Sequence, residues 1–397
     1  MLTLGMIQDA QAALRGIARR TPLESAPKIG QNLYIKAENL QLTGAFKLRG
    51  AYNKIRSLSK EEAARGVIAC SAGNHAQGIA LSATKLGIRS IICMPAGAPI
   101  SKVEATKAYG AEVVLVPGVY DDAAAEAERL TREKGYTFAH PFNDPLVIAG
   151  QGTIGLEILE QLPEVEQVIV PIGGGGLISG ISCAIKSMKP SCRIIGVQAA
   201  SVASMYTSCR RGAITTVADG DTNADGIHVL TPSQLTFELC QKYVDEIVTV
   251  SEDEIAAAIL ALMEGQKTVA EGAGATTAAA VMFHKVDVTA KKTVCVVSGG
   301  NVDVTTLSRI ITRGLSKAGR ITELTTKVTD KPGSLLLLLQ VVANTGANIL
   351  NITHSREDRR AEVNACIVSM VLETRNGDHV RQIEQELTQR GYFLLDS

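Results

Sequence analysis

Short apolar runs, each followed by a turn of small residues and a helix-forming stretch, recur through residues 67–297 of this sequence. These runs, rich in Val and Ile, stand at 67–70, 90–93, 112–116, 167–170, 193–197 and 293–297. Unbroken runs of this kind are typical of strands covered on both faces, and their alternation with helices indicates βαβ units around a parallel sheet. Because the runs fall into two series, we expect an α/β chain with two sheets, two lobes and a cleft.

Residues 321–397 follow a different pattern. Strands are expected at 321–329, 347–355, 362–373 and 392–395, with one helix after the turn at 330–333 and another at 378–388. The order βαββαβ is that of a ferredoxin-like domain. Residues 313–320, with two glycines and three basic residues, are expected to form a linker. We therefore expect a first domain at 1–312, with a smaller lobe at about 46–145, and a second domain at 321–397.

Charge and apolar patterning exclude several classes of function. Lys and Arg together number 40, as do Asp and Glu, so no overall charge attracts nucleic acid or an anionic membrane. The apolar runs at 335–339 and 341–343 are far shorter than the roughly 20 residues that span a bilayer. Residues 1–20 lack the pattern of a signal peptide, so we expect a cytoplasmic protein. The eight cysteines include no C-x-x-C pair and are expected to be buried thiols.

Lys47 is the first residue that could carry chemistry. It lies at 43–50 in a glycine turn that leads into a helix, among small and apolar neighbours. A partly desolvated lysine near a helix N-terminus has a lowered pKa, as a nucleophile that attacks aldehydes requires. Taken alone, the pattern also fits a solvated lysine.

The segment 71–78 follows a buried strand and opens a helix. Free backbone N–H groups at such a place bind a carboxylate, and Asn74 adds a neutral donor at the same edge. The residues concerned are Ser71, Ala72, Gly73, Asn74 and His75. An ordinary turn in which Ser71 or Asn74 caps the helix remains an alternative.

Four consecutive glycines follow the strand at 167–170 and precede a helix, so the backbone can close around a phosphate. The segment consists of Gly173, Gly174, Gly175, Gly176 and Leu177. It does not match G-x-G-x-x-G, because Ile178 and Ser179 stand where the last glycine would be, and no P-loop motif is present. A single phosphate is therefore favoured over a dinucleotide or a nucleoside triphosphate, with an empty tight turn as the alternative.

Ser298 follows the strand at 293–297, at the sheet edge where ligands of open α/β proteins lie. Its hydroxyl could bond a ring nitrogen without adding charge. A reactive lysine, a phosphate loop and a neutral partner for a ring nitrogen match the aldehyde, phosphate and pyridine of pyridoxal phosphate. Glu271 either lines this site near the cofactor or caps the glycine-rich turn in which it lies; the sequence leaves both open.

In the order and spacing of these motifs, residues 5–310 resemble fold-type II (tryptophan synthase β-like) pyridoxal-phosphate enzymes of the threonine ammonia-lyase family. The resemblance implies that Lys47 binds the cofactor covalently and acts as the catalytic base, Phe46 packs on its ring and Asn74 bonds its ring hydroxyl. It further implies a phosphate site at Gly173, Gly174, Gly175, Gly176 and Leu177, and Ser298 at the pyridine nitrogen. Ser71 to His75 would hold the substrate carboxylate, and no metal site is expected.

The implied reaction is β-elimination of water from L-threonine, followed by hydrolysis of the resulting aminocrotonate to 2-oxobutanoate and ammonia, with L-serine to pyruvate as a secondary activity. A neutral Ser298 at the ring nitrogen favours elimination over transamination. Serine racemase is the nearest alternative, but Ala72 replaces the proton-transferring serine of such enzymes. Gln198, Val202 and Ser204 stand where their metal loop carries acidic groups. A non-catalytic amino-acid sensor is the other alternative.

Residues 321–397 resemble an ACT domain, through the turn at 330–333 and the segment at 346–349. The resemblance implies a homo-oligomer, either dimer or tetramer, and an amino-acid effector such as isoleucine or valine. An assembly domain without a ligand remains the alternative.

Overall fold

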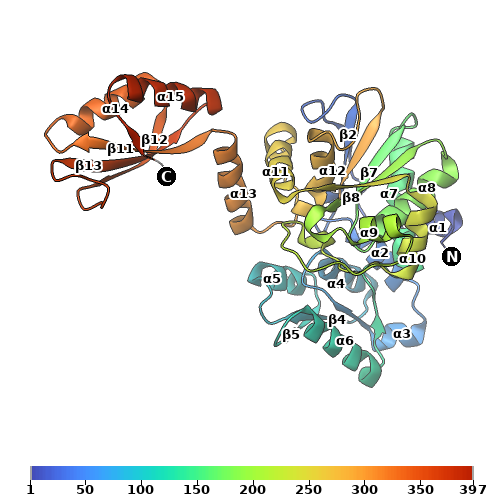
Figure 1. The fold of residues 1–397 in the computed structure, drawn as a ribbon. Coiled ribbons are helices and arrows are strands. Elements are labelled where there is room, and N and C mark those ends of the chain that lie inside the picture. The colour runs from blue at the N-terminus through green and yellow to red at the C-terminus, as the bar shows by residue number, and fades with distance from the viewer. Residues whose placement is uncertain (1, 396–397) are drawn as a thin grey trace. The chain divides into compact units, whose positions relative to one another are not determined.

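The computed structural model describes residues 2–395 (Figure 1). The chain forms two compact units, and the boundary between them in the sequence falls between Asp303 and Val304. The second unit begins with helix α13 (Val304–Lys317), so residues 313–317, expected to belong to a linker, are helical. Leu307, Ile310, Ile311 and Leu315 recur at helical spacing. A single glycine costs a helix only about 1 kcal/mol, so Gly314 does not interrupt it.

The large lobe of the first unit is built on a six-stranded sheet in the order β1-β2-β10-β7-β8-β9. Only the β1–β2 pair is antiparallel. The strands are β1 (Leu23–Ser25), β2 (Leu33–Ala37), β7 (Gln167–Pro171), β8 (Arg193–Ala199), β9 (Glu246–Val250) and β10 (Thr293–Val297). Because β2 pairs with β10, Leu33 opposite Thr293, the two ends of the first unit meet in one sheet.

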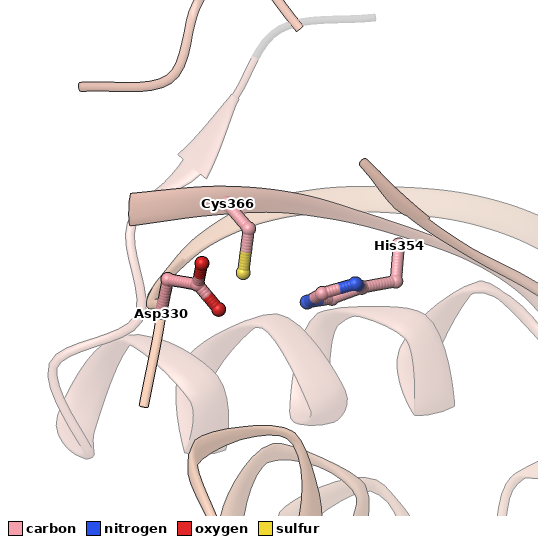
Figure 2. Close-up of side chains that lie close together, drawn as sticks. All are labelled: Asp330, His354 and Cys366. Carbon is pink, nitrogen blue, oxygen red and sulfur yellow. The ribbon is translucent and has the colours of Figure 1, made fainter. Parts of the chain in front are cut away.

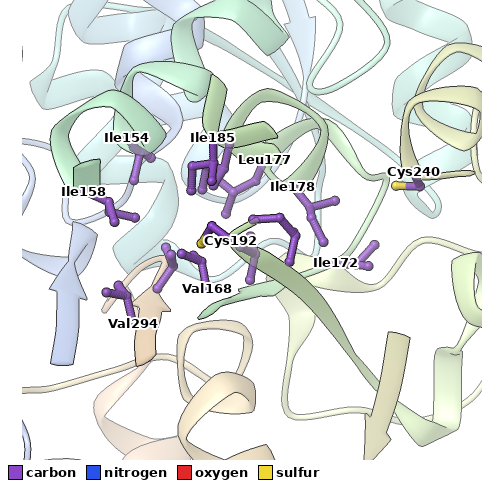
Figure 3. Close-up of a cluster of buried hydrophobic side chains, with 14 of the residues drawn as sticks. Ile154, Ile158, Val168, Ile172, Leu177, Ile178, Ile185, Cys192, Cys240 and Val294 are labelled. Carbon is purple, nitrogen blue, oxygen red and sulfur yellow. The ribbon is translucent and has the colours of Figure 1, made fainter. Parts of the chain in front are cut away.

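Helices surround this sheet. They are α1 (Leu4–Leu14), α2 (Lys47–Ile55), α7 (Pro145–Gln161), α8 (Gly176–Met188), α9 (Ser204–Arg211), α10 (Gln234–Tyr243), α11 (Glu252–Gln266) and α12 (Gly272–Met282), with short 3-10 turns η1 (Glu38–Leu40), η2 (Ala200–Val202) and η3 (Asp225–Ile227). Apolar side chains of β7, β10, α7, α8 and α10 form one buried core (Figure 3). This core fixes the start of α8, where the glycine segment lies.

The small lobe carries a four-stranded parallel sheet in the order β5-β4-β3-β6. Its strands are β3 (Val67–Cys70), β4 (Ser90–Pro95), β5 (Glu112–Val116) and β6 (Thr137–Phe138), and its helices are α3 (Lys60–Arg65), α4 (Asn74–Leu86), α5 (Ile100–Ala108) and α6 (Tyr120–Lys134). The two expected sheets are thereby confirmed. Helix α2 packs against both α4 and α7, so it joins the lobes.

The second unit contains an antiparallel sheet in the order β12-β13-β11-β14. Its elements follow as β11 (Ile321–Thr329), α14 (Ser334–Asn344), β12 (Asn348–Ser355), β13 (Ala365–Glu373), α15 (Gly377–Gln389) and β14 (Leu394–Leu395). This is the βαββαβ order that the sequence predicts. A separate core lies between the sheet and its two helices.

All eight cysteines are free thiols; seven are buried and Cys209 is half-buried. No helix within residues 2–395 has the length and apolar character needed to cross a membrane. The cytoplasmic location stays a prediction.

Candidate active site

The loop before Lys47 is hydrogen-bonded to the loop after β10. The amide of Phe46 donates to the Ser298 carbonyl at 3.1 Å, and the amide of Gly300 donates to the Gly44 carbonyl at 2.9 Å. Ala45 and Gly299 form an antiparallel bridge between the same loops. The predicted lysine and the predicted serine thus lie on directly joined segments, although some 250 residues separate them in sequence.

Lys47 is the first residue of α2, and its side chain is partly buried. Its Nζ donates to the Pro141 carbonyl at 3.2 Å and lies 5.2 Å from the centroid of the Phe46 ring. Burial lowers the pKa of Lys47 to about 8, against the opposing effect of the nearby Glu271 charge. A substantial fraction of this amine is therefore neutral near pH 7–8, which is the nucleophilic form.

Asn74 opens α4, but its side chain does not cap that helix. Its Nδ2 lies 2.8 Å and 3.0 Å from the two carboxyl oxygens of Glu271, and its Oδ1 accepts from Nδ2 of Asn301 at 2.8 Å. The same Asn301 nitrogen donates to the Thr43 carbonyl at 2.8 Å. Hydrogen bonds therefore run from the loop before Lys47, through Asn301 and Asn74, to Glu271.

The N-terminus of α4 has no side-chain cap. Gly73 occupies the cap position, and the Ser71 hydroxyl accepts from the Gly73 amide at 3.2 Å instead of from the helix. The capping role considered for Ser71 and Asn74 is thus not what the structure shows. The first N–H groups of the helix have no intrahelical partner, as an anion site requires.

The side chain of His75 turns into the small lobe. It is 3% exposed, and its Nε2 lies 2.8 Å from the Ala139 carbonyl. Burial, with a further contribution from Lys47, lowers the pKa of His75 to about 3, so the ring is neutral. It is therefore the backbone N–H of His75, and not its side chain, that lies at the N-terminus of α4.

The glycine segment precedes and opens α8, and added Cβ atoms would meet neighbours. A Cβ on Gly174 would overlap the Phe142 ring, and one on Gly176 would lie 2.9 Å from the Phe142 Cβ. Gly175 has φ +89°, which favours glycine. Phe142 follows Pro141, whose carbonyl accepts from Lys47. The 141–142 segment therefore touches both the glycine segment and the lysine.

An ion-pair network holds the first turn of α2 through Arg49. Arg49 is bonded to Glu38 and Glu157, and Lys36 is bonded to Glu157 at 2.5 Å. All four side chains are buried. Two positive and two negative charges balance, and the network ties α2 to η1 and α7.

Some of these residues were not identified from the sequence. Pro141, Phe142, Asn301 and Thr43 contact the predicted residues, but no motif assigned them a role. Pro141 and Phe142 lie in an irregular segment after β6, so only tertiary contacts reveal them. Asn301 lies three residues after Ser298, and a side-chain amide at a sheet edge is the signal that could have identified it.

The residues that stand where racemases carry their acidic metal loop form hydrogen bonds or are buried within the large lobe. The Gln198 Oε1 accepts from the Tyr206 amide at 2.8 Å, the Ser204 hydroxyl donates to the Val229 carbonyl at 2.6 Å, and Val202 is buried. Among the residues that the structure describes, one group has the composition and proximity of metal ligands, and it lies in the second unit.

That group is Asp330, His354 and Cys366, whose ligand atoms lie within 4.8 Å of one another (Figure 2). Arg356, however, donates to both carboxyl oxygens of Asp330, at 2.7 Å and 3.0 Å. The Cys366 thiol donates to the Val328 carbonyl at 3.5 Å, and burial raises its pKa. Asp330 is therefore held in an ion pair and the Cys366 thiol stays protonated, so neither group is available to bind a metal.

Comparison with known proteins gives a consistent result. A family model described as pyridoxal-phosphate dependent enzyme matches residues 14–300. An L-threonine ammonia-lyase from Thermotoga maritima is 52% identical over 396 residues, covering 99% of this chain and 98% of that protein. Among solved structures, processed threonine deaminase isoform 2 from Solanum lycopersicum is 39% identical with a TM-score of 0.74, covering 78% of this chain and 87% of that one. Maize serine racemase is 35% identical with a TM-score of 0.74, covering 80% and 98%.

Proposed function

Because the chain belongs to the family of pyridoxal-phosphate dependent enzymes, we propose that the residues assembled around Lys47 are its active site. The first unit has the fold-type II architecture. The enzyme is a lyase that deaminates L-threonine to 2-oxobutanoate and ammonia. The observation that carries the site proposal is the position of Lys47, which contacts the segment packed on the glycine loop and lies near the Asn74–Glu271 pair.

The residues present fit pyridoxal phosphate. The glycine segment has no side chains and leads into the N-terminus of α8, which suits one phosphate group. The lysine amine has a lowered pKa, as covalent attachment to an aldehyde requires. Ser298 is neutral and buried at the end of β10, where a ring nitrogen could be bonded without a charge. Phe46, Lys47, Asn74, Gly173 to Gly176, Leu177 and Ser298 are therefore proposed to hold the cofactor.

When bound, pyridoxal phosphate supplies an aldehyde that links to amines and a conjugated ring that accepts electron density from Cα. With the cofactor bound, the Lys47 amine would be the base that takes the Cα proton of threonine, since its neutral form is available near neutral pH. The segment Ser71 to His75, with the free N–H groups of the first turn of α4, would bind the substrate carboxylate. An uncharged Ser298 would bond the ring nitrogen without adding a charge there, which favours elimination of the β-hydroxyl, leaving as water with a proton, over transamination.

Serine racemisation is the second candidate, favoured by the similarity to the maize enzyme. It requires a proton-transferring group on the opposite face of Cα. Ala72 stands where the racemases that this chain resembles carry a serine, and a methyl group has no exchangeable proton to deliver. L-serine is therefore proposed as a secondary substrate that yields pyruvate.

The activity is tested by adding L-threonine to cofactor-loaded protein and measuring 2-oxobutanoate, with L-serine and pyruvate as a parallel assay. Lys47→Ala should abolish both products while the fold is kept. Lys60→Ala, an exposed lysine at the start of α3, is the matched control and should behave as the wild type. Keto acid release by Lys47→Ala at the wild-type rate would exclude Lys47 as the base.

For the second unit, we propose an ACT-type regulatory domain that binds isoleucine or valine. An amino-acid ligand needs a carboxylate for its ammonium group and a cation or free N–H groups for its carboxylate. Asp330 lies in the exposed turn between β11 and α14 (Figure 2), Arg356 follows β12 and donates to Asp330, and the start of α14 has no side-chain cap. These groups support an effector site at this turn.

We also propose that the enzyme is a homo-oligomer. The exposed apolar side chains Leu336 and Leu337 on α14, and Leu350 and Ile352 on β12, form surfaces suited to a second copy. Titrating isoleucine and valine against 2-oxobutanoate release, with sedimentation in parallel, tests both proposals. Asp330→Asn should weaken the effector response and leave turnover without effector unchanged. An equal response in the variant would argue against this turn as the site.

A further inference from the structure

Glu271 occupies the N-cap position of α12 but does not cap that helix with its side chain. The side chain is buried, with the residue 4% exposed, and both carboxyl oxygens lie within hydrogen-bond distance of Asn74 Nδ2, at 2.8 Å and 3.0 Å. Of the two roles that the sequence left open for this residue, lining the site is the one that the contacts support. The buried carboxyl group of Glu271 accepts from an active-site side chain and does not cap its helix, which points to a functional role.

The contacts of Asn74 allow only one orientation of its amide. Asn301 donates to the oxygen end at 2.8 Å, and its own position is fixed by the Thr43 carbonyl at 2.8 Å. Glu271 accepts from the nitrogen end. Rotating the amide by half a turn would place the Asn74 oxygen against a carboxyl group and the nitrogen against another N–H donor, so both contacts would be lost.

The space around the carboxyl group depends on glycines. A Cβ on Gly299 would lie 2.5 Å from Oε1 of Glu271, and one on Gly226 would lie 3.3 Å from it. Gly299 follows Ser298, and Gly226 lies in η3. The backbone on two sides of Glu271 is therefore shaped to admit this side chain.

Three charged groups act on Glu271 from the elements around it. They are Lys47 on α2, Lys102 on α5 and Asp225 in η3, and Lys102 and Asp225 are themselves paired at 2.6 Å. Burial raises the pKa of Glu271 to about 7; Asp225 raises it further, whereas the Asn74 hydrogen bond and Lys102 lower it. The carboxyl group therefore changes its charge near neutral pH, in the range where Lys47 also does.

We propose that Glu271 is a positioning residue for the cofactor, which holds the Asn74 amide ready to donate to the ring oxygen and tunes the charge of Lys47. An amide NH2 has two hydrogens, so Asn74 can keep its bond to Glu271 and still donate to a bound ring. A negative Glu271 favours the ammonium form of Lys47, and a neutral one favours the free amine that attacks the aldehyde. This inference rests on the proposed function of the site.

The test compares Glu271→Gln and Glu271→Asp with the wild type in the cofactor-free protein. The first readout is the Kd for pyridoxal phosphate, and the second is the pH midpoint of the rate of covalent attachment, followed by absorbance. Because Glu271→Gln replaces a charged acceptor by a neutral one, we expect the Kd to rise about tenfold to a hundredfold. Loss of the negative charge beside Lys47 should lower the pH midpoint by about one unit.

Glu271→Asp retains the charge on a shorter side chain, so its pH midpoint should stay near the wild-type value even though its affinity falls. Glu252→Gln is the matched control, since Glu252 is also a hydrogen-bonded glutamate at a helix N-terminus, bonded to Ser201 and Asn223. It should change neither readout. A purely structural role for Glu271 predicts a lower melting temperature with an unchanged pH midpoint.

An unchanged Kd and midpoint in Glu271→Gln, while the wild type binds pyridoxal phosphate and releases 2-oxobutanoate, would overturn this proposal and leave the function standing. Failure of the wild type to bind the cofactor or release the keto acid would overturn the proposed function itself. Combining Asn74→Ala with Glu271→Gln provides a further check. If Glu271 acts through Asn74, the double variant should bind the cofactor no more weakly than Asn74→Ala alone.

Discussion

Arg49 donates two parallel hydrogen bonds to Glu38, from Nε at 2.9 Å and from Nη2 at 2.8 Å, and both side chains are almost fully excluded from solvent. The same guanidinium donates to Glu157 at 2.6 Å and 3.0 Å. Arg49 lies two residues after Lys47, on the first turn of α2. The helix that carries the reactive lysine is therefore anchored by buried charge and not only by apolar packing.

Arg49→Leu should destabilise the cofactor-free protein by about 3–5 kcal/mol, because it leaves carboxylates buried without their partner. The loss is measured by urea unfolding at pH 7.5, from the transition of the first unit. Arg89→Leu, which breaks the exposed Arg89–Glu112 pair, is the control and should cost less than about 1 kcal/mol. Equal small losses in both variants would contradict the anchoring role of Arg49.

Attachment of pyridoxal phosphate to the cofactor-free protein should become faster as the pH rises and level off above about pH 8. Burial lowers the pKa of Lys47 to about 8, and only the neutral amine attacks an aldehyde. Below this value the neutral fraction falls about tenfold for each pH unit. Stopped-flow absorbance between pH 6 and 9 checks this expectation, and a rate that keeps rising beyond pH 10 would indicate a solvated lysine instead.

Gly174→Ala should weaken the binding of pyridoxal phosphate by about tenfold or more, because the added Cβ overlaps the Phe142 ring and must displace it or the glycine segment. Equilibrium dialysis measures the Kd. Phe142→Ala in the same chain removes the overlap and should recover part of the affinity. Gly97→Ala is the control, since a Cβ there meets nothing within 4 Å. Affinity that is lost equally with and without Phe142 would show that the overlap is not the cause.

The wild-type protein should convert L-serine to pyruvate without forming D-serine above the level of an enzyme-free sample. Ala72 carries no group that could deliver a proton to the opposite face of Cα. Ala72→Ser introduces such a hydroxyl and should yield measurable D-serine by chiral chromatography. Ala96→Ser, an exposed position after β4, is the control for an added hydroxyl. D-serine formation by the wild type at a rate near that of pyruvate would favour the racemase alternative.

Elements with strong local patterns were predicted closely. Strands β5, β10 and β11 span Glu112–Val116, Thr293–Val297 and Ile321–Thr329, with the expected bounds, and α4 begins at Asn74, inside the segment expected to open a helix. Strand β10 is buried along its whole length, and burial on both faces of a parallel strand leaves a signal in the sequence that needs no tertiary information. Lys47 and the glycine segment were likewise identified as candidate site residues from short sequence motifs.

The partners of these residues could not be predicted in this way. Pro141, Asn301 and Glu271 reach Lys47 and Asn74 from segments far away in sequence, and their pairing depends on how the two lobes meet. Helix α13 was missed at 313–317 because glycine and basic residues suggested a break, whereas its apolar spacing continues to Leu315. At 313–317 the helical spacing of the apolar residues decides the structure, and the local content of glycine and basic residues does not.

The pairing of β2 with β10 has a consequence for synthesis of the chain on the ribosome. Leu33 emerges early, but its partner Thr293 is made roughly 250 residues later, on the order of 10–50 s at typical rates of translation. During that interval the edge of β2 is without its parallel neighbour, while the small lobe, built from one continuous segment, already has all of its strands. The nascent chain thus holds a finished small lobe and an open, apolar sheet edge, which is the form of this enzyme most exposed to aggregation and to chaperone binding.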